Sequence, residues 1–181
     1  MSEILQHNFE TIKPTSVFTT TIVDPDMVDK LVEEIKKSGD KQDHKTNVKA
    51  YMTDWNMSGK PGFDEFEKGV LDITKFLSKK YYRREIQPRI SDMWGMIYNK
   101  GNYAITHDHW PALWSFAYYL NAPKDAPGLF FPEMGEQGGE RKLEQGLFIM
   151  FEGHIKHAVR QTKFKGYRYA VSGNLHEVIN D

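Results

Sequence analysis

Two of the seven histidines in this sequence stand two positions apart, in His107-Asp108-His109. On an extended segment, residues i and i+2 project to the same face, so both imidazoles converge on one point while Asp108 faces away. A third ligand from a distant strand would complete a metal site with open coordination positions, as a catalytic metal requires. The alternative interpretation is a polar strand end with solvated histidines.

A second pair of histidines follows an apolar run from Gly146 to Phe151, which is typical of a buried strand that ends in a turn. Either His154 or His157 is placed to supply a third ligand at the mouth of a β core. Arg168 comes eleven residues after His157, inside an otherwise apolar strand pattern. Burying an arginine is costly unless an anion meets it, so this position indicates either an anion site or an outward-facing strand residue.

The composition narrows the chemistry to these side chains. The 181 residues contain no cysteine, which excludes a disulfide framework, a thiol nucleophile and a cysteine-ligated metal. The sequence has 24 Lys and Arg against 25 Asp and Glu, a net charge of −1, and so lacks the basic excess of nucleic-acid-binding proteins. No run approaches the roughly 18 to 20 apolar residues of a membrane span, and the N-terminus lacks a signal-peptide pattern. We therefore expect a cytoplasmic protein with neither a nucleic-acid nor a membrane partner.

The first half of the chain is predicted to supply two helices. Asp24 and Pro25 are typical of an N-cap and a first helical residue, and an apolar period of helical spacing continues to about Lys37. Gly39 is the expected C-terminal cap. A second apolar stripe predicts a helix over about 63–82.

Strands dominate the remainder. The stretch 40–60 is polar and predicted to be loop, and the glycine-rich segment 135–141 is predicted to be a surface loop. Short apolar or alternating segments predict strands at 16–23, 93–98, 114–120, 128–132, 146–151, 157–162 and 167–174. We therefore expect one α+β domain over 1–181. Residues 1–90 form a helical support region, and 91–181 form most of an antiparallel sandwich, barrel or jelly roll.

The order of these motifs resembles that of the iron(II)- and 2-oxoglutarate-dependent oxygenases, whose core is a double-stranded β-helix (jelly roll). Segment 106–121, THDHWPALWSFAYYLN, is similar to the family's first metal motif and the strand behind it. Segment 146–159 resembles the part that carries the distal metal histidine, and Arg168 stands where the family places its 2-oxoglutarate arginine. The resemblance covers roughly residues 93–175 and is closest to a bacterial and phage subgroup related to prolyl hydroxylases.

The resemblance implies a hydroxylase or related oxygenase that uses Fe(II), 2-oxoglutarate as co-substrate, and O2. The implied metal ligands are His107, His109 and His157. Arg168 would pair with the distal carboxylate of 2-oxoglutarate, and three further residues implied by position to contact the co-substrate are Tyr119, Tyr98 and Ser115. Peptidyl proline is the substrate suggested by analogy. No motif assigns the prime substrate, whether a protein, a peptide or a small molecule, or the oligomeric state.

Two positions depart from the family pattern. Most members have HxD where this sequence has His107-Asp108-His109, so three neutral imidazoles leave a charge of +2 at Fe(II) instead of +1. The serine that is common two residues after the arginine is replaced by Ala170. Two other functions therefore stay open: a three-histidine cupin-like dioxygenase that does not use 2-oxoglutarate, and a non-catalytic jelly-roll binding module. Only the 2-oxoglutarate enzyme needs a buried Arg168, and only the binding module allows the three histidines to lie apart.

Overall fold

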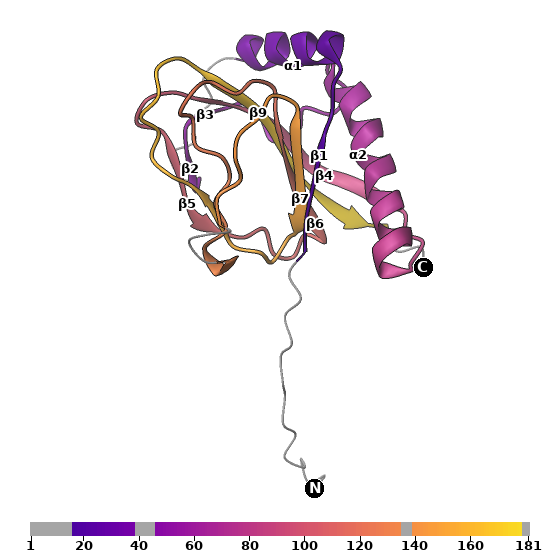
Figure 1. The fold of residues 1–181 in the computed structure, drawn as a ribbon. Helices are drawn as coiled ribbons and strands as arrows, with labels where there is room; N and C mark the ends of the chain where they lie inside the picture. The colour runs from indigo at the N-terminus through magenta and orange to yellow at the C-terminus, as the bar shows by residue number, and fades with distance from the viewer. Residues whose placement is uncertain (1–15, 39–45, 135–138, 179–181) are drawn as a thin grey trace, which may run out of the picture.

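The structure is a computed structural model that describes residues 16–38, 46–134 and 139–178 (Figure 1). Its two α-helices precede most of its strands, so the predicted α+β content is confirmed. A π-helical turn, η1 (Ser78–Tyr82), and a 3-10 turn, η2 (Pro132–Met134), complete the helical elements. The helices and strands in chain order are β1 (Val17–Thr21), α1 (Pro25–Lys37), β2 (Val48–Lys49), β3 (Tyr51–Met52), α2 (Phe63–Leu77), β4 (Pro88–Tyr98), β5 (Tyr103–His107), β6 (Trp114–Tyr119), β7 (Leu147–Glu152), β8 (His157–Val159) and β9 (Arg168–Glu177).

Helix α1 begins as its sequence predicts. The Asp24 side chain accepts a hydrogen bond of 3.0 Å from the backbone N–H of Met27, and Pro25 is the first helical residue. Met27, Leu31 and Ile35 are buried at helical spacing. The predicted cap Gly39 lies outside the described residues.

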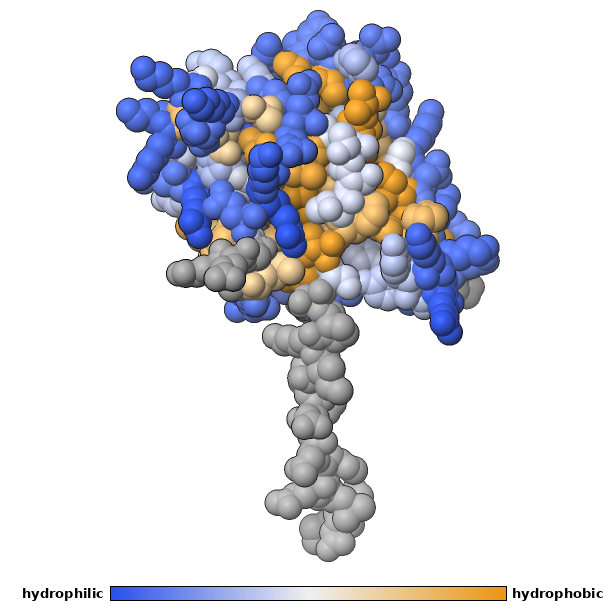
Figure 2. All heavy atoms as spheres, viewed as in Figure 1, coloured by the Kyte–Doolittle hydropathy of each residue, from blue (hydrophilic) through white to orange (hydrophobic). Residues whose placement is uncertain are grey.

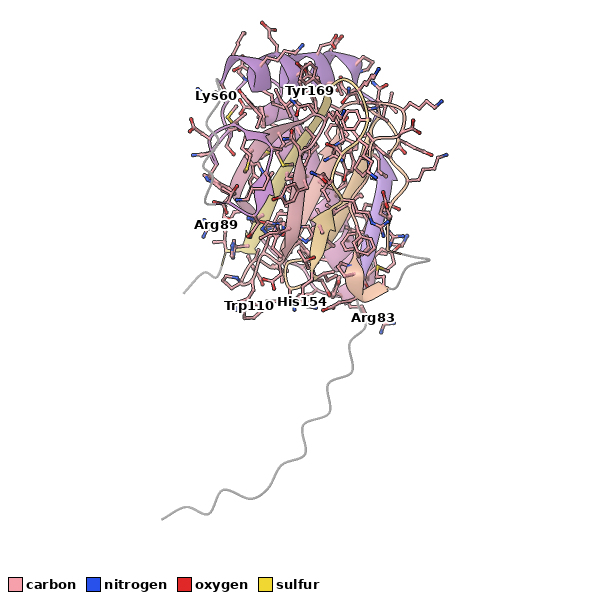
Figure 3. The ribbon with its side chains drawn as sticks, turned by 90° about the vertical axis from the view of Figure 1, so that its left-hand side faces the viewer. Lys60, Arg83, Arg89, Trp110, His154 and Tyr169 are labelled. Carbon is pink, nitrogen blue, oxygen red and sulfur yellow. The ribbon has the colours of Figure 1, made fainter. Side chains whose placement is uncertain are left out.

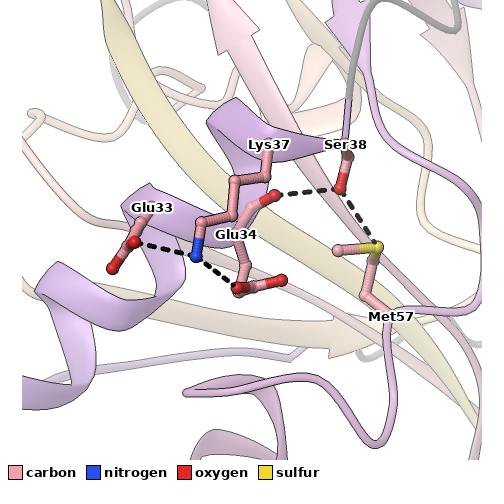
Figure 4. Close-up of polar contacts among 5 residues, drawn as sticks. All are labelled: Glu33, Glu34, Lys37, Ser38 and Met57. Carbon is pink, nitrogen blue, oxygen red and sulfur yellow. Dashed lines mark hydrogen bonds and ion pairs between the residues drawn. The ribbon is translucent and has the colours of Figure 1, made fainter.

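The last turn of α1 is held by local polar contacts (Figure 4). The Lys37 ammonium lies 2.7 Å from a Glu33 carboxylate oxygen and 3.2 Å from one of Glu34, which places a cation at the negative end of the helix dipole. The Ser38 hydroxyl donates to the Glu34 carbonyl at 2.9 Å and lies 3.9 Å from the sulfur of Met57. These contacts join the end of α1 to the segment that precedes α2.

Helix α2 confirms the second predicted helix, although its last turn is not α-helical. The α-helix ends at Leu77, and η1 continues the chain to Tyr82. Arg83 then adopts a left-handed conformation with φ of 54° and ends the element. The buried stripe consists of Phe63, Phe66, Val70, Thr74 and Leu77.

Two antiparallel sheets form the β structure. The larger sheet has the strand order β1-β7-β6-β9-β4-β3, and the smaller has the order β2-β5-β8. In Figure 1, α1 lies across one end of the larger sheet and α2 runs beside it. One apolar core joins both helices to the outer face of this sheet, and a second core lies between the two sheets. Apolar side chains reach the surface as a band beside β1, between that strand and α2 (Figure 2).

The close packing of α1 on the sheet depends on one glycine. Gly95 stands in the middle of β4, and a Cβ there would overlap the side chain of Ile35. The absence of a side chain therefore allows the buried face of α1 to contact the backbone of the strand. This contact fixes β4, whose opposite face lines the space between the sheets.

Several strand predictions are corrected. The segment 128–132 is not a strand: only Phe130 forms bridges there, to Glu140 and Ala158, while its neighbours Leu129 and Phe131 are buried. The segment is thus paired only through isolated bridges, although these two apolar side chains are packed in the core. The other predicted strands are present with shifted ends: β4 begins at residue 88, β8 ends at 159 and β9 continues to 177.

Three strands, β2, β3 and β5, were not predicted. β5 has only one buried residue, Ala104, because it lies in the small sheet with its other face toward solvent, so it lacks an apolar pattern. The stretch 40–60, predicted as loop, contains β2 and β3, and the Tyr51 hydroxyl anchors it by donating to the Ile35 carbonyl at 3.0 Å. Residues 39–45, and residues 135–138 of the predicted surface loop, lie outside the described residues. Within the described residues, neither helix is long and apolar enough to cross a membrane.

Candidate metal and anion site

Side chains alternate along the strands of the larger sheet, so that one face packs against the helices and the other faces the smaller sheet. On β6, Trp114, Phe116 and Tyr118 pack in the core under the helices, whereas Ala117 and Tyr119 pack between the sheets. β4 and β9 follow the same alternation, and their register pairs Trp94 with Ser172 and Tyr98 with Arg168. The inner face therefore presents cross-strand rows of side chains to the smaller sheet.

The smaller sheet brings two histidines together directly. His107 is the last residue of β5 and His157 is the first of β8, and the two are register partners. His109 comes from the loop that leaves β5, and its backbone N–H donates to the Gly153 carbonyl at 2.7 Å. A Cβ on Gly153 would overlap the backbone oxygen of Ala112, so this glycine permits the loop to approach. The end of β5 with its following loop and the start of β8 thus bring the three imidazoles together.

The three rings form one cluster. One ligand nitrogen from each of His107, His109 and His157 lies within 4.8 Å of those of the other two. Nε2 of His109 and Nε2 of His157 are 3.2 Å apart. Two imidazole nitrogens bound at right angles to one ion, at about 2.1 Å each, would be about 3.0 Å apart. The observed spacing therefore fits neighbouring ligands of a single metal ion, and the third ring is near enough to join them by rotation.

Backbone carbonyls fix the tautomers of two rings. Nδ1 of His107 donates to the Ile105 carbonyl at 2.7 Å, and Nδ1 of His157 donates to the Ile155 carbonyl at 3.0 Å. Because a carbonyl oxygen can only accept, each Nδ1 carries the proton and each Nε2 keeps its lone pair. Hydrogen bonds of this kind orient histidines that bind metals.

Burial keeps the cluster neutral. It is the main cause that lowers the pKa of His109 to about 4 and that of His157 to about 3, and the neighbouring histidines lower both further. Burial also lowers the pKa of His107. Neutral imidazole is the form that binds a metal, so protons do not compete for the lone pairs near neutral pH.

The other residues of the two motifs lie outside the cluster. Asp108 is exposed, and its carboxylate accepts a hydrogen bond of 3.2 Å from the Trp110 backbone N–H. The side chain of His154 is 46% exposed, and its Nε2 lies 3.8 Å from a Glu152 oxygen. The structure thus brings His157, rather than His154, to the pair from β5.

Arg168 is buried at the far end of the same interior space. Its residue is 1% exposed, and its guanidinium carbon lies 4.1 Å from the ring centroid of Tyr98 and 5.4 Å from that of Tyr119. Nη1 donates to the Pro127 carbonyl, whereas Nε has no hydrogen-bond partner within 16–38, 46–134 and 139–178. Burial raises the pKa of both tyrosines, so their hydroxyls stay protonated. In the described part of the chain no carboxylate pairs with this cation.

One narrow cavity of about 40 Å³ connects the two features. Its walls include all three clustered histidines, Arg168, Tyr98 and Tyr119. Figure 3 shows the two ends: Trp110, which follows His109, lies near His154 at one end of the molecule, and Tyr169, which follows Arg168, lies at the opposite end. Larger hollows of about 470 and 490 Å³ open elsewhere, and neither contains a clustered histidine.

Ser115 is the one predicted site residue that does not line this cavity. It is buried on β6, and its hydroxyl donates to the side-chain oxygen of Asn174 at 2.9 Å. Ala117, two residues further along the same face, lines the cavity instead. The lining residues that sequence reasoning missed include two with polar groups, Trp94 and Ser172, and alternation with Tyr98 and Arg168 is the signal that places them on the same face.

Comparisons with known proteins find relatives by structure alone. No protein-family model matches the chain, and no curated protein matches it. A viral collagen prolyl hydroxylase from Paramecium Bursaria Chlorella virus-1, in complex with 2-oxoglutarate, is 18% identical with a TM-score of 0.69, over 90% of this chain and 96% of that one. A prolyl-4-hydroxylase from Pseudomonas putida is 13% identical with a TM-score of 0.69, over 92% of this chain and 95% of that one. HygX from Streptomyces hygroscopicus, with nickel and 2-oxoglutarate bound, is 10% identical with a TM-score of 0.64, over 89% of this chain and 82% of that one. The chain therefore shares its fold with these proteins.

Proposed function

We propose that this protein is an Fe(II)- and 2-oxoglutarate-dependent oxygenase that hydroxylates its substrate. The observation that carries the proposal is that one cavity contains three convergent neutral histidines and a buried arginine that pairs with no carboxylate among the described residues. The fold shared with two prolyl hydroxylases and with HygX supports it.

The donor set fits Fe(II). His107, His109 and His157 supply three nitrogen ligands of the kind that iron accepts, and three protein ligands leave positions for a co-substrate and for oxygen. The hydrogen bonds to Ile105 and Ile155 hold two of the rings with Nε2 toward the cluster.

The opposite end of the cavity suits the distal carboxylate of 2-oxoglutarate. A carboxylate beside Arg168 would gain a charge-assisted hydrogen bond from its unpaired Nε and would compensate a buried cation. Tyr98 and Tyr119 flank the guanidinium, and their protonated hydroxyls are available as further donors. The present cavity has room for only a few water molecules, so we expect these side chains to move apart when the co-substrate enters.

The protein's part in the reaction is to bind and to orient. When bound, Fe(II) with 2-oxoglutarate and O2 supplies the oxidation of a substrate C–H bond, while the co-substrate loses CO2 and becomes succinate. Arg168 would fix the co-substrate by its far end, and the apolar side chains between the sheets would exclude water. No side chain is required to take up or release a proton.

Arg168 also distinguishes this function from its alternatives. A cupin-like dioxygenase that binds substrate directly to iron has no use for a buried cation remote from the metal, so the burial of Arg168 favours the 2-oxoglutarate enzyme. A binding module without a metal has no reason to bring three unprotonated imidazoles within 4.8 Å, so the cluster argues against that function.

The fold completes the proposal. We propose that the two sheets form a double-stranded β-helix, because the chain crosses repeatedly from one sheet to the other between β4 and β9. The two sheets enclose one core. We also propose a single domain over 1–181, because both helices share a core with the larger sheet.

Anaerobic titration tests the proposal directly. The protein is expected to bind one Fe(II) and then one 2-oxoglutarate, and to release succinate once O2 is admitted. Proline-containing peptides are the first substrates to assay, since two structural neighbours are prolyl hydroxylases. Binding of Fe(II) with no affinity for 2-oxoglutarate would instead support the cupin-like alternative.

A further inference from the structure

Trp94 is a buried hydrogen-bond donor without an acceptor. The residue is 3% exposed, and its indole Nε1 has no hydrogen-bond partner among the described residues. It lies on β4 and lines the cavity that contains the histidine cluster. A buried N–H left without an acceptor costs free energy, so its presence beside a ligand cavity calls for an acceptor from the ligand.

Register places Trp94 near the metal end of this cavity. Its ring centroid lies 6.1 Å from that of His109, and its cross-strand partner is Ser172, which also lines the cavity. The pair of Tyr98 and Arg168 stands four residues further along the same two strands, a separation of about 13 Å at 3.3 to 3.4 Å per residue. A five-carbon dicarboxylate, together with the side chains at both ends, can fill that length.

Two unsatisfied donors in one cavity match a ligand with two anionic ends. In the described part of the chain, three buried side-chain atoms lack a hydrogen-bond partner, and two of them, Trp94 Nε1 and Arg168 Nε, belong to residues that line this cavity. An indole N–H can only donate, and it forms its strongest hydrogen bonds with charged oxygens. Arg168 accounts for one carboxylate of 2-oxoglutarate and leaves the other without a protein partner.

We propose that the indole N–H of Trp94 donates to the carboxylate of 2-oxoglutarate that lies next to the metal. The inference rests on the proposed function and adds a second residue that determines how the co-substrate is held. Trp55 packs against Trp94 edge to face, with ring centroids 4.7 Å apart, and so limits rotation of the indole. Trp94 thus recognises the carboxylate at the metal end, whereas Arg168 recognises the distal carboxylate.

A ligand that lacks the distal carboxylate tests which residue binds which carboxylate. The Ni(II)-loaded protein, which does not turn over, is titrated calorimetrically with 2-oxoglutarate and with 2-oxobutanoate, which keeps the 2-oxo acid and lacks the distal carboxylate. Trp94→Phe retains an aromatic ring and loses the donor. It is expected to weaken both ligands by about tenfold, as for the loss of a hydrogen bond to a charged group. Arg168→Ala is expected to weaken 2-oxoglutarate only.

Trp110→Phe is the matched control, because it also replaces an indole by a phenyl ring, at an exposed position that does not line the cavity, and it should leave both affinities unchanged. Wild-type affinity of Trp94→Phe for both ligands, beside a normal loss in Arg168→Ala, would overturn this inference and leave the proposed function intact. Failure of the wild-type protein to bind 2-oxoglutarate at all would overturn the proposed function itself.

A second measurement uses the wild-type chain. Its four tryptophans give four indole signals in a 15N spectrum. In the Zn(II)-loaded protein, addition of 2-oxoglutarate is expected to move one indole N–H signal downfield as the hydrogen bond forms. If 2-oxoglutarate binds and all four signals stay in place, the inference is wrong, whatever the variants do.

Discussion

Nε2 of His109 lies 3.2 Å from Nε2 of His157, although 48 positions separate the two residues. The pairing of β5 with β8 and the hydrogen bond from His109 N–H to the Gly153 carbonyl bring them together. Because Nδ1 of His157 carries that ring's proton, its Nε2 lone pair faces the other ring. A divalent metal ion placed between two such nitrogens could accept a lone pair from each, so this geometry suits a metal site.

Removal of one ligand should abolish tight metal binding. His107→Ala leaves two imidazoles and is expected to weaken Fe(II) binding by at least about 100-fold, since even outer hydrogen-bond partners of metal ligands contribute 10- to 100-fold. His154→Ala is the matched control, because that exposed histidine lies outside the cluster. Anaerobic equilibrium dialysis with iron analysis measures both. Tight stoichiometric iron in a folded His107→Ala variant would contradict the ligand set.

Loss of the buried cation should act on the co-substrate and not on the metal. Truncating one partner of a buried charge pair costs about 2 to 5 kcal/mol, so Arg168→Ala is expected to raise the Kd for 2-oxoglutarate by about 30-fold or more. Fe(II) affinity should stay unchanged. Arg160→Ala removes an exposed arginine that lies 3.6 Å from Glu140, and it serves as the control. Unaltered 2-oxoglutarate affinity in Arg168→Ala would remove this residue from the pocket.

Substitution of Ser115 should change stability more than binding. Its hydroxyl donates to the Asn174 side chain at 2.9 Å, so Ser115→Ala leaves a partly buried acceptor unpaired. We expect a loss of about 1 to 2 kcal/mol in the free energy of unfolding, measured by urea denaturation, with a normal Kd for 2-oxoglutarate. A tenfold weaker Kd at unchanged stability would instead support the role that the sequence suggested for this serine.

The metal-free protein should lose stability as the pH falls below the ordinary histidine pKa. The pKa values of His109 and His157 are about 4 and about 3 in the folded protein, against 6.5 for the model group. Between these values the unfolded chain binds more protons than the folded one, so acid favours unfolding, whereas above pH 6.5 both states are neutral and the contribution vanishes.

From pH 7 to pH 5 this effect amounts to at most about 2 kcal/mol for each of these two histidines. Urea denaturation in the presence of a chelator, repeated across this range, measures it. His109→Gln removes one titrating ring and should show a shallower decline. An equally steep decline in that variant would assign the pH dependence to other groups.

Local signals predicted the helices and the ligand pair. Asp24 caps α1 by accepting a hydrogen bond from a residue three positions away, and His107 and His109 are only two positions apart. Both features can therefore be recognised from a few consecutive residues. The local pattern singled out Arg168 and left His154 and His157 as alternatives, and only the resemblance to the family assigned their roles. The position of His157 beside the pair from β5 depends on sheet pairing that no local pattern encodes. The same limit explains the strand predicted at 128–132, where only Phe130 forms isolated bridges.

Trp94 and Ser115 illustrate what local sequence could not resolve. The sequence analysis gives Trp94 no role, because an aromatic side chain in a strand is ordinary and nothing in the pattern around it marks a site. Only the structure shows that its indole N–H has no acceptor among the described residues and that the residue lines the cavity. Ser115 faces the space between the sheets, as expected, yet it lies one row beyond the cavity wall and meets Asn174 there.

Alternate side chains of β6 serve the cavity and the core under the helices. Tyr119 faces Arg168 while its neighbour Tyr118 stacks on Phe66 of α2. Deleting a single residue within Trp114–Tyr119 would exchange the two faces, turning core aromatics toward the cavity and cavity residues toward the helices. The strand therefore tolerates substitution far better than a change in length, and natural variation in length should be confined to the loops at its ends.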